Sequence, residues 1–365
     1  LLMSDANSIH TKKWVESLTI YGNDVVLFSF FKPSENVLKE YESFNVKVVS
    51  PDLRQKIRKI RHPNISKIRY LGSLGLLKQK INDFDPDIIH AHYASSYGFL
   101  GFLSGFKPFI LSVWGSDIYY FPQKNWINKL LMKKIIKYPT AVCSTSQAMK
   151  KIAIKDFHRM DIDVIPFGID LDLFYPKNRF KEKFIVGTIK SIENYNGIDC
   201  LIDSANIVIN DFKKDISFII VGSGSLKKDM EEKVKTLNLG DKIKFLGFVD
   251  HGSVRKYYEM LSIFVAVSTR ESFGVSVLEA AALEIPSITS NIGGLTEVNL
   301  HNKTGIVIEP DRPLQLAKSI IKLYEDSKMR KNLGVNARKM VIEKFNWDES
   351  IKKMLKVYKN AIKDK

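Results

Sequence analysis

Short apolar runs alternate with helical patterns along this chain, and the alternation occurs in two separate series. Strands that are apolar throughout and separated by helices are typical of a parallel sheet with helices on both faces. The first series predicts seven strands, which are expected at 1–4, 25–28, 46–49, 88–91, 109–113, 141–143 and 164–165. A second series runs from Phe184 to about Phe345. We therefore predict an α/β protein with two Rossmann-like domains, each built on a parallel sheet.

The segment between the two series is rich in Pro, Gly and Asp and covers residues 165–176. We place an interdomain hinge there. This predicts an N-terminal domain over 1–168 and a C-terminal domain over 169–345, followed by a basic amphipathic helix over 346–365. Folds of this kind bind ligands at the carboxyl ends of their strands. A fold alone does not name a function, so the function has to be argued from individual sites.

The chain is basic, with a formal net charge of +16. The excess is concentrated between Leu53 and Asn82, which hold nine basic residues and no acid. A solvated surface, an anionic membrane surface and a charged glycan acceptor all remain open as explanations. Nucleic acid is not expected as a partner, because no recognition motif accompanies the charge.

The cellular compartment is predicted from what the chain contains. Cys143 and Cys200 both lie in apolar patterns, so we expect two reduced, buried thiols. The longest apolar run, Tyr97 to Phe106, falls short of the ~20 residues that span a bilayer, and we expect a buried helix there. With no secretory signal at the start of the sequence, we expect a cytoplasmic protein, and peripheral binding to the inner face of the membrane stays open.

Two glutamates, Glu271 and Glu279, stand eight positions apart. Residues 263–267 before them are typical of a buried strand, and residues 275–283 have helical spacing. The backbone N–H groups of 272–274 would then open a helix, which suits a phosphate. Glu279 would lie roughly 7–8 Å further along the helix axis. The two carboxylates are therefore expected to bracket an extended ligand, with a diphosphate between its reactive end and a ribose.

This stretch resembles the E-x7-E element of the retaining glycosyltransferases of family 4, which have the GT-B fold. The resemblance continues through most of 184–345, because further family motifs follow in the expected order. They are Val221-Gly222-Ser223-Gly224, Phe245 to Val249, Asn291 to Glu297 and Thr304 to Val307. It implies two Rossmann-like domains that face a cleft, with the last helix crossing back onto the first domain.

The resemblance also implies an activity, in which a sugar moves with retention from a nucleoside-diphosphate donor to an acceptor hydroxyl. It implies no metal and no cofactor, and we favour a UDP-sugar over a GDP-sugar. Glu271 is the expected catalytic carboxylate. The implied donor-binding residues are Lys190, Gly222, Gly224, Val249, Ser272, Phe273, Gly274 and Glu279. For Gly222 and Gly224, a tight turn without ligand contact remains open.

The sequence departs from the family pattern at several positions. The second family lysine, expected before Gly197, is replaced by Asn196, and Lys227 is only a weak substitute. The glycine pair after the first strand is absent, and Asn7, Ser8 and His10 stand there instead. They are candidates for acceptor contact, although Asn7 or Ser8 could simply cap the helix.

The loop at Val113-Trp114-Gly115-Ser116-Asp117 resembles one in which the family often has a sugar-contacting histidine. Trp114 stands at that position, and a Trp cannot serve as a base. Asp117 is therefore our candidate for acceptor contact or proton handling, with helix capping as the alternative. We expect His90 and His92 to point to opposite faces of their strand, with His92 the better candidate for the cleft. Three Asp-x-Asp matches, at 85–87, 161–163 and 170–172, lie among turn residues, so no metal site is predicted.

The predicted function is a glycosyltransferase that modifies a glycan or a lipid-linked acceptor, in cell-surface polysaccharide or glycolipid synthesis. Two alternatives remain. A GT-B sugar-nucleotide epimerase would interconvert its nucleotide sugar without an acceptor. A non-catalytic subunit that binds a glycan or a nucleotide sugar would not hydrolyse the donor.

Overall fold

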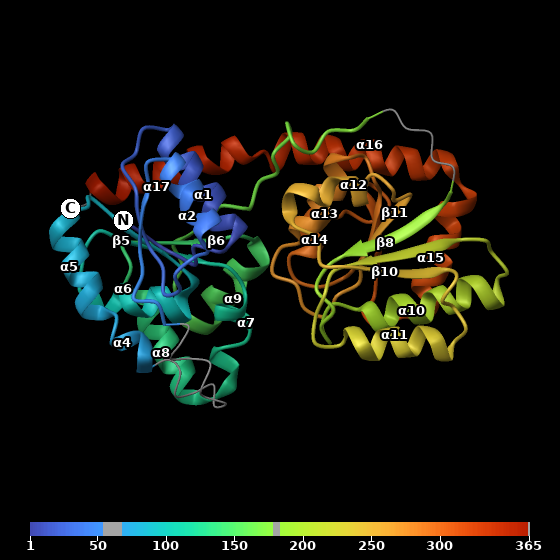
Figure 1. Ribbon diagram of the computed structural model, residues 1–365, viewed down its shortest axis with the longest axis horizontal. Helices are drawn as coiled ribbons and strands as arrows, with labels where there is room; N and C mark the ends of the chain where they lie inside the picture. The colour runs from blue at the N-terminus through green and yellow to red at the C-terminus, as the bar shows by residue number, and fades with distance from the viewer. Residues whose placement is uncertain (54–67, 178–182, 364–365) are drawn as a thin grey trace. The chain divides into compact units, whose positions relative to one another are not determined.

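The computed structural model describes residues 1–53, 68–177 and 183–363. The chain divides into two compact units (Figure 1). The first unit comprises Leu1–Pro166 together with Ser350–Lys365, and the second comprises Phe167–Glu349.

The first unit is built on a parallel sheet of seven strands in the order β3-β2-β1-β4-β5-β6-β7. The strands are β1 (Leu2–Met3), β2 (Val26–Phe28), β3 (Lys47–Val49), β4 (Ile89–His92), β5 (Phe109–Val113), β6 (Ala141–Ser144) and β7 (Ile162–Val164). The strand order reverses direction between β1 and β4. In an open parallel sheet such a point is where loops diverge and a ligand can enter. The prediction of seven strands in a parallel sheet is confirmed.

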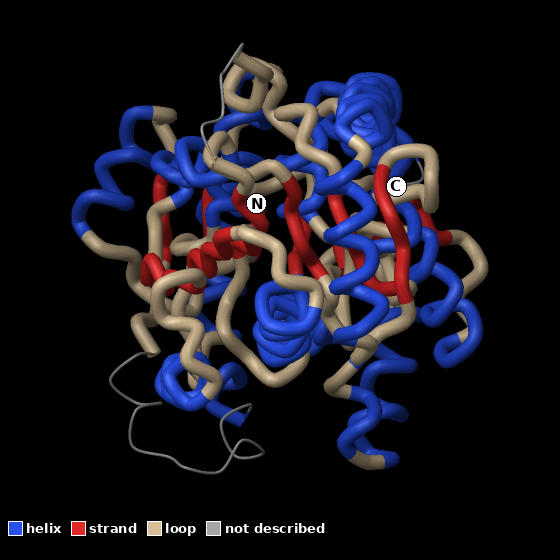
Figure 2. The backbone as a smooth tube through the Cα atoms, turned by 90° about the vertical axis from the view of Figure 1, so that its right-hand side faces the viewer, coloured by secondary structure: helices blue, strands red, loops and turns tan. Residues whose placement is uncertain are grey.

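Helices cover both faces of this sheet. Figure 2 colours the helices blue and the strands red throughout the described residues. The helices are α1 (Ile9–Ile20), α2 (Glu35–Ser43), α4 (Ile68–Leu71), α5 (Leu74–Phe84), η1 (Tyr93–Gly98), α6 (Phe99–Ser104), α7 (Ser116–Tyr119), η2 (Pro122–Lys124), α8 (Trp126–Lys137), α9 (Gln147–Phe157) and α17 (Trp347–Lys363). Successive strand residues point to opposite faces. Accordingly, Leu2 belongs to the core beneath α1 and α2, and Met3 belongs to the larger core on the other face.

The last helix packs on the first unit, as the sequence predicts. Its residues Ile351, Met354 and Ala361 are buried. The hydroxyl of Tyr358 lies 2.6 Å from Nδ1 of His90 on β4. The C-terminal residues from Ser350 onward therefore belong to the same compact unit as the first strand.

The second unit is built on a parallel sheet of six strands in the order β10-β9-β8-β11-β12-β13. The strands are β8 (Ile185–Ile189), β9 (Ser217–Val221), β10 (Ile243–Gly247), β11 (Ile263–Ala266), β12 (Ser287–Ser290) and β13 (Gly305–Ile308). Here the order reverses between β8 and β11. The loops that leave these two strands therefore diverge at one edge, as in the first unit.

Helices again lie on both faces of the sheet (Figure 1). They are α10 (Ile198–Asn206), η3 (Ile207–Asp211), α11 (Lys227–Thr236), η4 (His251–Ser253), α12 (Val254–Tyr258), α13 (Val275–Ala282), α14 (Leu295–Val298), α15 (Pro313–Glu325) and α16 (Ser327–Lys344). Side chains of α10, α11 and α15 join the main core of the unit. The glutamates of interest belong to α13 and to the loop before it.

Both cysteines are free and buried, as predicted. The apolar run from Tyr97 to Phe106 forms the end of η1 and then α6, so the expected helix is present. Within the described residues, no helix is both long enough and apolar enough to cross a bilayer. Most of the basic stretch, Arg54 to Lys67, lies outside the described residues.

Candidate functional site

The loops that follow β8 and β9 approach each other closely at the candidate site. Gly222 has φ +145°, and a Cβ there would collide with the carbonyl oxygen of Lys190. A Cβ on Gly224 would collide in the same way with the carbonyl of Ile192. The two glycines after β9 therefore let the neighbouring loops approach closely. This geometry supports the tight-turn reading of the motif and places both glycines against the loop of Lys190.

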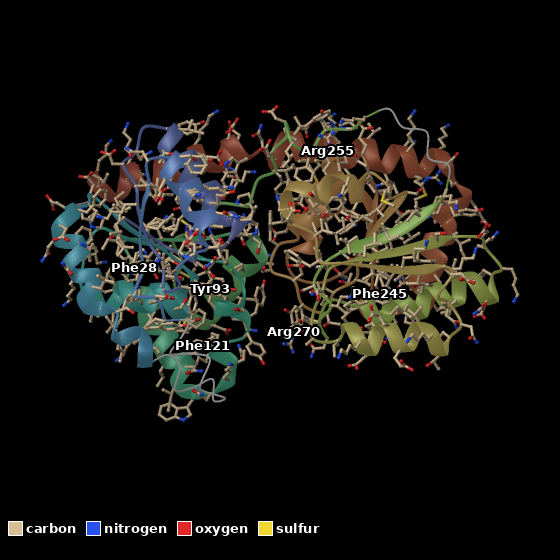
Figure 3. All side chains as sticks on the ribbon, viewed as in Figure 1. Phe28, Tyr93, Phe121, Phe245, Arg255 and Arg270 are labelled. Carbon is tan, nitrogen blue, oxygen red and sulfur yellow. The ribbon has the colours of Figure 1, made fainter. Side chains whose placement is uncertain are left out.

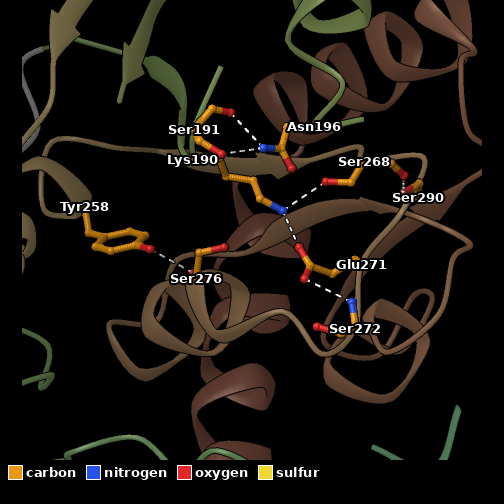
Figure 4. Close-up of polar contacts among 9 residues, drawn as sticks. All are labelled: Lys190, Ser191, Asn196, Tyr258, Ser268, Glu271, Ser272, Ser276 and Ser290. Atoms are coloured by element: carbon orange, nitrogen blue, oxygen red, sulfur yellow. Dashed lines mark hydrogen bonds and ion pairs between the residues drawn. The ribbon is translucent and has the colours of Figure 1, made fainter. Parts of the chain in front are cut away.

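Lys190 is held by side chains that follow β11 (Figure 4). Its Nζ donates to Oγ of Ser268 at 2.9 Å and forms an ion pair with Oε2 of Glu271. Only 9% of the lysine side chain and 19% of the glutamate side chain are exposed. Oε1 of Glu271 accepts from the backbone N–H of Ser272 at 3.1 Å. The structure thus brings together three of the predicted residues: a cation, a carboxylate and the first residue of the phosphate turn.

The turn into α13 ends on a glycine and lacks a side-chain cap. Gly274 is the N-cap with φ +106°, a conformation that favours glycine, and no side chain caps the helix. The Phe273 ring is buried and packs against Phe167 and Phe345, with ring centroids 6.2 and 5.8 Å away. The Phe273 ring is therefore not available to a ligand, and the predicted role of this residue would rest on its backbone N–H. The first turn of α13 contains no acid, which leaves the positive end of the helix dipole uncompensated.

Glu279 lies on α13 and is 6% exposed. Its Oε1 is 2.8 Å from Nε2 of His251, and its Oε2 accepts from the Tyr258 hydroxyl at 2.7 Å. Burial, together with the charge of Glu279, raises the pKa of Tyr258 well above its ordinary value, so this phenol stays a donor. Each oxygen retains a further lone pair for a ligand hydroxyl. The two partners orient the carboxylate.

Sequence reasoning missed His251 and Tyr258. They lie 28 and 21 positions before Glu279, and no local pattern links them to it. Val249 stands in the loop between β10 and η4 and is partly buried. Its neighbour Phe248 is 81% exposed, an unusual position for a large apolar side chain. That exposure marks Phe248 as a further candidate for ligand contact.

The position of the second family lysine has a structural role in this chain. The Asn196 side-chain amide donates to the backbone carbonyl and the hydroxyl of Ser191, both at 2.8 Å, and so closes the loop after β8. Lys227 pairs with Glu231 at 3.6 Å on α11. Arg270 is exposed on the loop that leads to Glu271, and Figure 3 labels it there. Arg270 is thus a second candidate cation, which the sequence analysis did not single out.

A cluster of rings lies at the reversal point of the first unit. Nδ1 of His92 is 3.0 Å from Oγ of Ser4, whose hydroxyl is 2.6 Å from that of Thr11. The Trp114 ring lies 4.3 Å from the His92 ring and 6.0 Å from the His10 ring, measured between centroids. The structure therefore brings His10, His92 and Trp114 together. Nε2 of His92 is buried with no hydrogen-bond partner among the described residues.

The expectation that His90 and His92 point to opposite faces is wrong. Residues two apart on a strand share a face, and the two rings lie only 4.6 Å apart. Nε2 of His90 is 2.8 Å from the Ser112 hydroxyl, and Nδ1 is close to Tyr358. His90 is thus a buried, hydrogen-bonded histidine. In the part of the chain that the structure describes, no group of three or more His, Cys, Asp or Glu could hold a metal ion.

Asp117 is fully buried, which does not suit the predicted contact with an acceptor. Its Oδ2 accepts from the Ala94 amide at 2.9 Å, and its Oδ1 accepts from the amides of Gly115 and Trp114 at 2.8 and 3.3 Å. Burial raises the pKa of this carboxyl, while the amide donors oppose the rise. The helix-capping alternative is the closer one, because Asp117 ties its own loop to the start of η1. We assign Asp117 a structural role.

Tyr93 is a functional candidate that the sequence gave no reason to single out. It directly follows His92, has φ +74°, and begins a π-helix (Figure 3). A tyrosine rarely adopts this backbone conformation, and such strain and π-helical turns both concentrate at functional sites. Its hydroxyl is 3.1 Å from that of Ser116. Tyr93 therefore joins the ring cluster around Trp114, 6.2 Å away between centroids.

Asn7 and Ser8 lie at the entrance to α1. Asn7 is exposed, and its backbone and side-chain N–H groups donate to Oδ1 of Asp5 at 3.0 and 3.1 Å. Ser8 is the N-cap residue by backbone conformation, but its side chain makes no capping bond. The capping alternative is therefore supported for Ser8 by its backbone conformation, but not by a side-chain hydrogen bond.

Two family models match this chain in succession. Residues 1–146 match the family described as glycosyl transferase 4-like, and residues 172–340 match the glycosyl transferases group 1. The chain is a glycosyltransferase. This glycosyltransferase is 28% identical over 311 residues to an uncharacterized glycosyltransferase of Methanocaldococcus jannaschii, covering 81% of this chain and 83% of the relative. It is 27% identical to the UDP-Gal:alpha-D-GlcNAc-diphosphoundecaprenol alpha-1,3-galactosyltransferase of Escherichia coli, covering 83% and 82% of the two chains.

Solved structures share the fold of this chain over nearly its full length. Sucrose-phosphate synthase from Thermosynechococcus elongatus superposes with a TM-score of 0.84 at 20% identity, over 100% of this chain and 99% of that one. Anabaena HepE in complex with UDP superposes with a TM-score of 0.80 at 18% identity, over 98% of each chain. At these identities the likeness concerns the fold, which is GT-B as predicted.

The close approach at Gly222 gives a first prediction. Gly222→Ala is expected to lower the free energy of unfolding by about 1–3 kcal/mol or more. The reason is that a side chain there is strained and collides with the Lys190 carbonyl. Gly240→Ala is the matched control, since a Cβ there meets no atom within 4 Å, and it should change stability by less than about 0.5 kcal/mol. Denaturant unfolding of both variants measures the difference. Equal stabilities would contradict the close approach.

The buried histidines predict how stability depends on pH. Burial lowers the pKa of His90 from 6.5 to about 3 and that of His92 well below 6.5. As pH falls below about 6, these two imidazoles bind protons in the unfolded chain but stay neutral in the folded chain. The free energy of unfolding should therefore fall by about 1.4 kcal/mol per pH unit for each histidine.

Unfolding monitored by tryptophan fluorescence suits this test, because Trp14, Trp114 and Trp126 belong to the first unit. In His90→Gln, the slope of the free energy of unfolding against pH should fall by the contribution of one proton. The contribution of His92 should remain. An unchanged slope in this variant would show that His90 is not kept neutral by the fold.

Proposed function

We propose that this glycosyltransferase moves a sugar, with retention of its anomeric configuration, from a UDP-sugar to a hydroxyl of a glycan or lipid-linked acceptor. The observation that carries the proposal is the arrangement at the start of α13. The Lys190–Glu271 ion pair lies beside the turn whose backbone amides, 272–274, precede α13, and Glu279 is buried further along the same helix. A diphosphate on the amides would have a cation at one end and a carboxylate for the ribose at the other.

The transfer step needs negative charge on the leaving diphosphate to be stabilised. Lys190, the positive end of α13 and the exposed Arg270 are positioned on adjoining loops of one sheet edge and would supply that charge. Preorganised donors of this kind typically contribute the largest part of the rate enhancement. The Glu271 carboxylate keeps the Lys190 ammonium in place through their ion pair and would contact the transferred sugar.

Retention in this proposal does not use a pair of catalytic carboxylates. A double displacement would require two carboxyl groups ~5 Å apart at the sugar. Here Glu271 is held by Lys190 and the Ser272 amide, while Glu279 is held by His251 and Tyr258 in the interior of the unit. The two glutamates therefore have separate roles, and attack from the face of the leaving diphosphate is the mechanism that we favour.

The acceptor is proposed to bind the ring cluster of the first unit, formed by His10, His92, Tyr93 and Trp114. Aromatic rings offer flat apolar faces, and the histidine nitrogens offer hydrogen bonds to hydroxyls. The E. coli relative is named for a UDP-galactose donor and a diphosphoundecaprenol-linked acceptor, and HepE was crystallised with UDP. These two proteins support UDP as the nucleotide, a lipid-linked acceptor, and a role in polysaccharide or glycolipid synthesis.

A product assay tests this proposal. The protein is incubated with UDP-galactose, UDP-glucose, UDP-N-acetylglucosamine or GDP-mannose, with and without a lipid-diphosphate N-acetylglucosamine acceptor, and nucleotide release and products are measured. One UDP-sugar is expected to give an acceptor-dependent product whose anomeric proton shows the configuration of the donor. An inverted product would refute retention. Interconversion of the nucleotide sugar without acceptor would instead identify the epimerase, and no consumption of any donor would identify the non-catalytic subunit.

A further inference from the structure

Large apolar side chains are exposed together at the start of α8. Trp126 is 71% exposed, Ile127 is 58% exposed and Leu130 is 52% exposed, and Tyr120 just before η2 is 52% exposed. Trp126 and Leu130 are one helical turn apart and lie side by side on the helix surface. The neighbouring Phe121, labelled in Figure 3, is buried and anchors this end of the helix to the core. We call Trp126, Ile127, Leu130, Lys133, Lys134 and Lys137 the α8 face.

The exposed apolar residues are additional to those that hold α8 in place. On the opposite side of the helix, Met132, Ile135 and Ile136 are fully buried and pack into the core. Asn125 caps the helix by accepting from the Asn128 amide at 2.8 Å. The fold of this segment therefore does not require a tryptophan or an isoleucine on the outer side. Exposed apolar groups that the fold does not use mark a surface for interaction.

Positive charge follows the apolar group along the same helix. The segment Trp126–Lys137 contains four lysines and no acid. Lys129 has a distant partner in Asp156 at 3.9 Å. Within the described part of the chain, Lys133, Lys134 and Lys137 have no acidic partner within 4.0 Å. By helical spacing, Lys134 and Lys137 continue the side that carries Trp126, Ile127 and Leu130.

We propose that the α8 face docks this protein on an anionic lipid surface. Trp126, Ile127 and Leu130 enter the boundary between headgroups and acyl chains, and the lysines contact headgroup phosphates. An exposed Trp beside aliphatic side chains and lysines, on a helix anchored by its other side, has the composition of an interfacial helix. The net charge of +16 adds a long-range attraction to a negative surface.

A second copy of this chain is the less suitable occupant. A two-fold dimer through the α8 face would bring the same lysines of both copies together, and like charges across an interface are costly. A lipid surface has negative charge beside an apolar layer, which matches both parts of the face. The proposal does not depend on the sugar-transfer reaction.

Vesicle flotation without donor or acceptor tests the proposal on the full chain. The vesicles are phosphatidylcholine alone or an equal mixture of phosphatidylcholine and phosphatidylglycerol. The protein is expected to float with the mixed vesicles at low salt and less at high salt. W126S/I127S/L130S should weaken this partitioning at least about tenfold. K133Q/K134Q/K137Q should weaken it by about fivefold for each lysine lost.

Matched variants separate the α8 face from general hydrophobicity and charge. I20S/L71S/M160S removes three other exposed apolar side chains of the first unit, and K32Q/K39Q/K47Q removes three other exposed lysines. Both should float as the unchanged protein does. Tryptophan emission should also shift to shorter wavelength on mixed vesicles, and the shift should be lost in Trp126→Ser.

Three outcomes would overturn the proposal. One is no flotation of the unchanged protein, and another is equal loss in the matched variants. The third is a dimer in sedimentation that W126S/I127S/L130S converts to a monomer without any change in flotation. Because no donor is present, none of these results depends on whether the protein transfers a sugar.

Discussion

Replacing Lys190 with methionine is expected to lower kcat/KM for sugar transfer by a factor of about 10²–10³. The Lys190 side chain is 9% exposed and its ammonium is held by Ser268 and Glu271, so it is fixed before the reaction begins. Methionine fills a similar volume but supplies no charge to the leaving diphosphate. It also leaves the Glu271 carboxylate facing the diphosphate without its counter-ion.

Steady-state kinetics with a saturating acceptor measures this loss, and the melting temperature shows whether the variant remains folded. Lys227→Met is the matched control, because this lysine follows the glycine turn that packs against the Lys190 loop but pairs with Glu231 on α11. It should retain activity within about threefold. A Lys190→Met enzyme that retained full activity would remove Lys190 from the reaction.

The second large effect is expected on donor binding. Glu279→Gln should weaken binding of UDP about tenfold to hundredfold, because a ribose hydroxyl would lose a bond to a charged acceptor. The amide also cannot accept from both His251 and Tyr258 while accepting from a ligand, because it has one carbonyl oxygen. The rate constant of the bound complex should change less than the affinity.

Calorimetry with UDP and with 2′-deoxy-UDP tests this prediction. The unchanged protein should prefer UDP, and Glu279→Gln should lose most of that preference. His251→Gln should have an intermediate effect, since it keeps the carboxylate but removes one of the partners that orient it. If the preference for UDP survives in Glu279→Gln, the carboxylate does not contact the ribose.

The fold could be predicted from the sequence because strand and helix periods are local properties. The apolar runs before Asp5, after Asp87 and after Phe184 indicated parallel strands, and the sheets contain them. The site around Glu271 could be located for a similar reason. A strand, a glycine and a short helix in direct succession define where the N-terminal amides of a helix lie.

Contacts between distant segments could not be predicted. Nothing near Glu279 in the sequence indicates His251 or Tyr258, and nothing near Trp114 indicates that it lies against His92. The positive φ of Tyr93 leaves no signal in the residue type. Asp117 illustrates the opposite error, since a carboxylate after a glycine suggested chemistry, whereas three backbone amides occupy its oxygens.

The most direct test of this account is a crystal structure of the protein with bound UDP. The diphosphate is expected within hydrogen-bond distance of the backbone amides of 272–274 and close to the Lys190 ammonium. The ribose hydroxyls should lie against the Glu279 carboxylate. UDP bound elsewhere, with the turn before α13 empty and Glu279 in contact only with His251 and Tyr258, would contradict the proposed donor site.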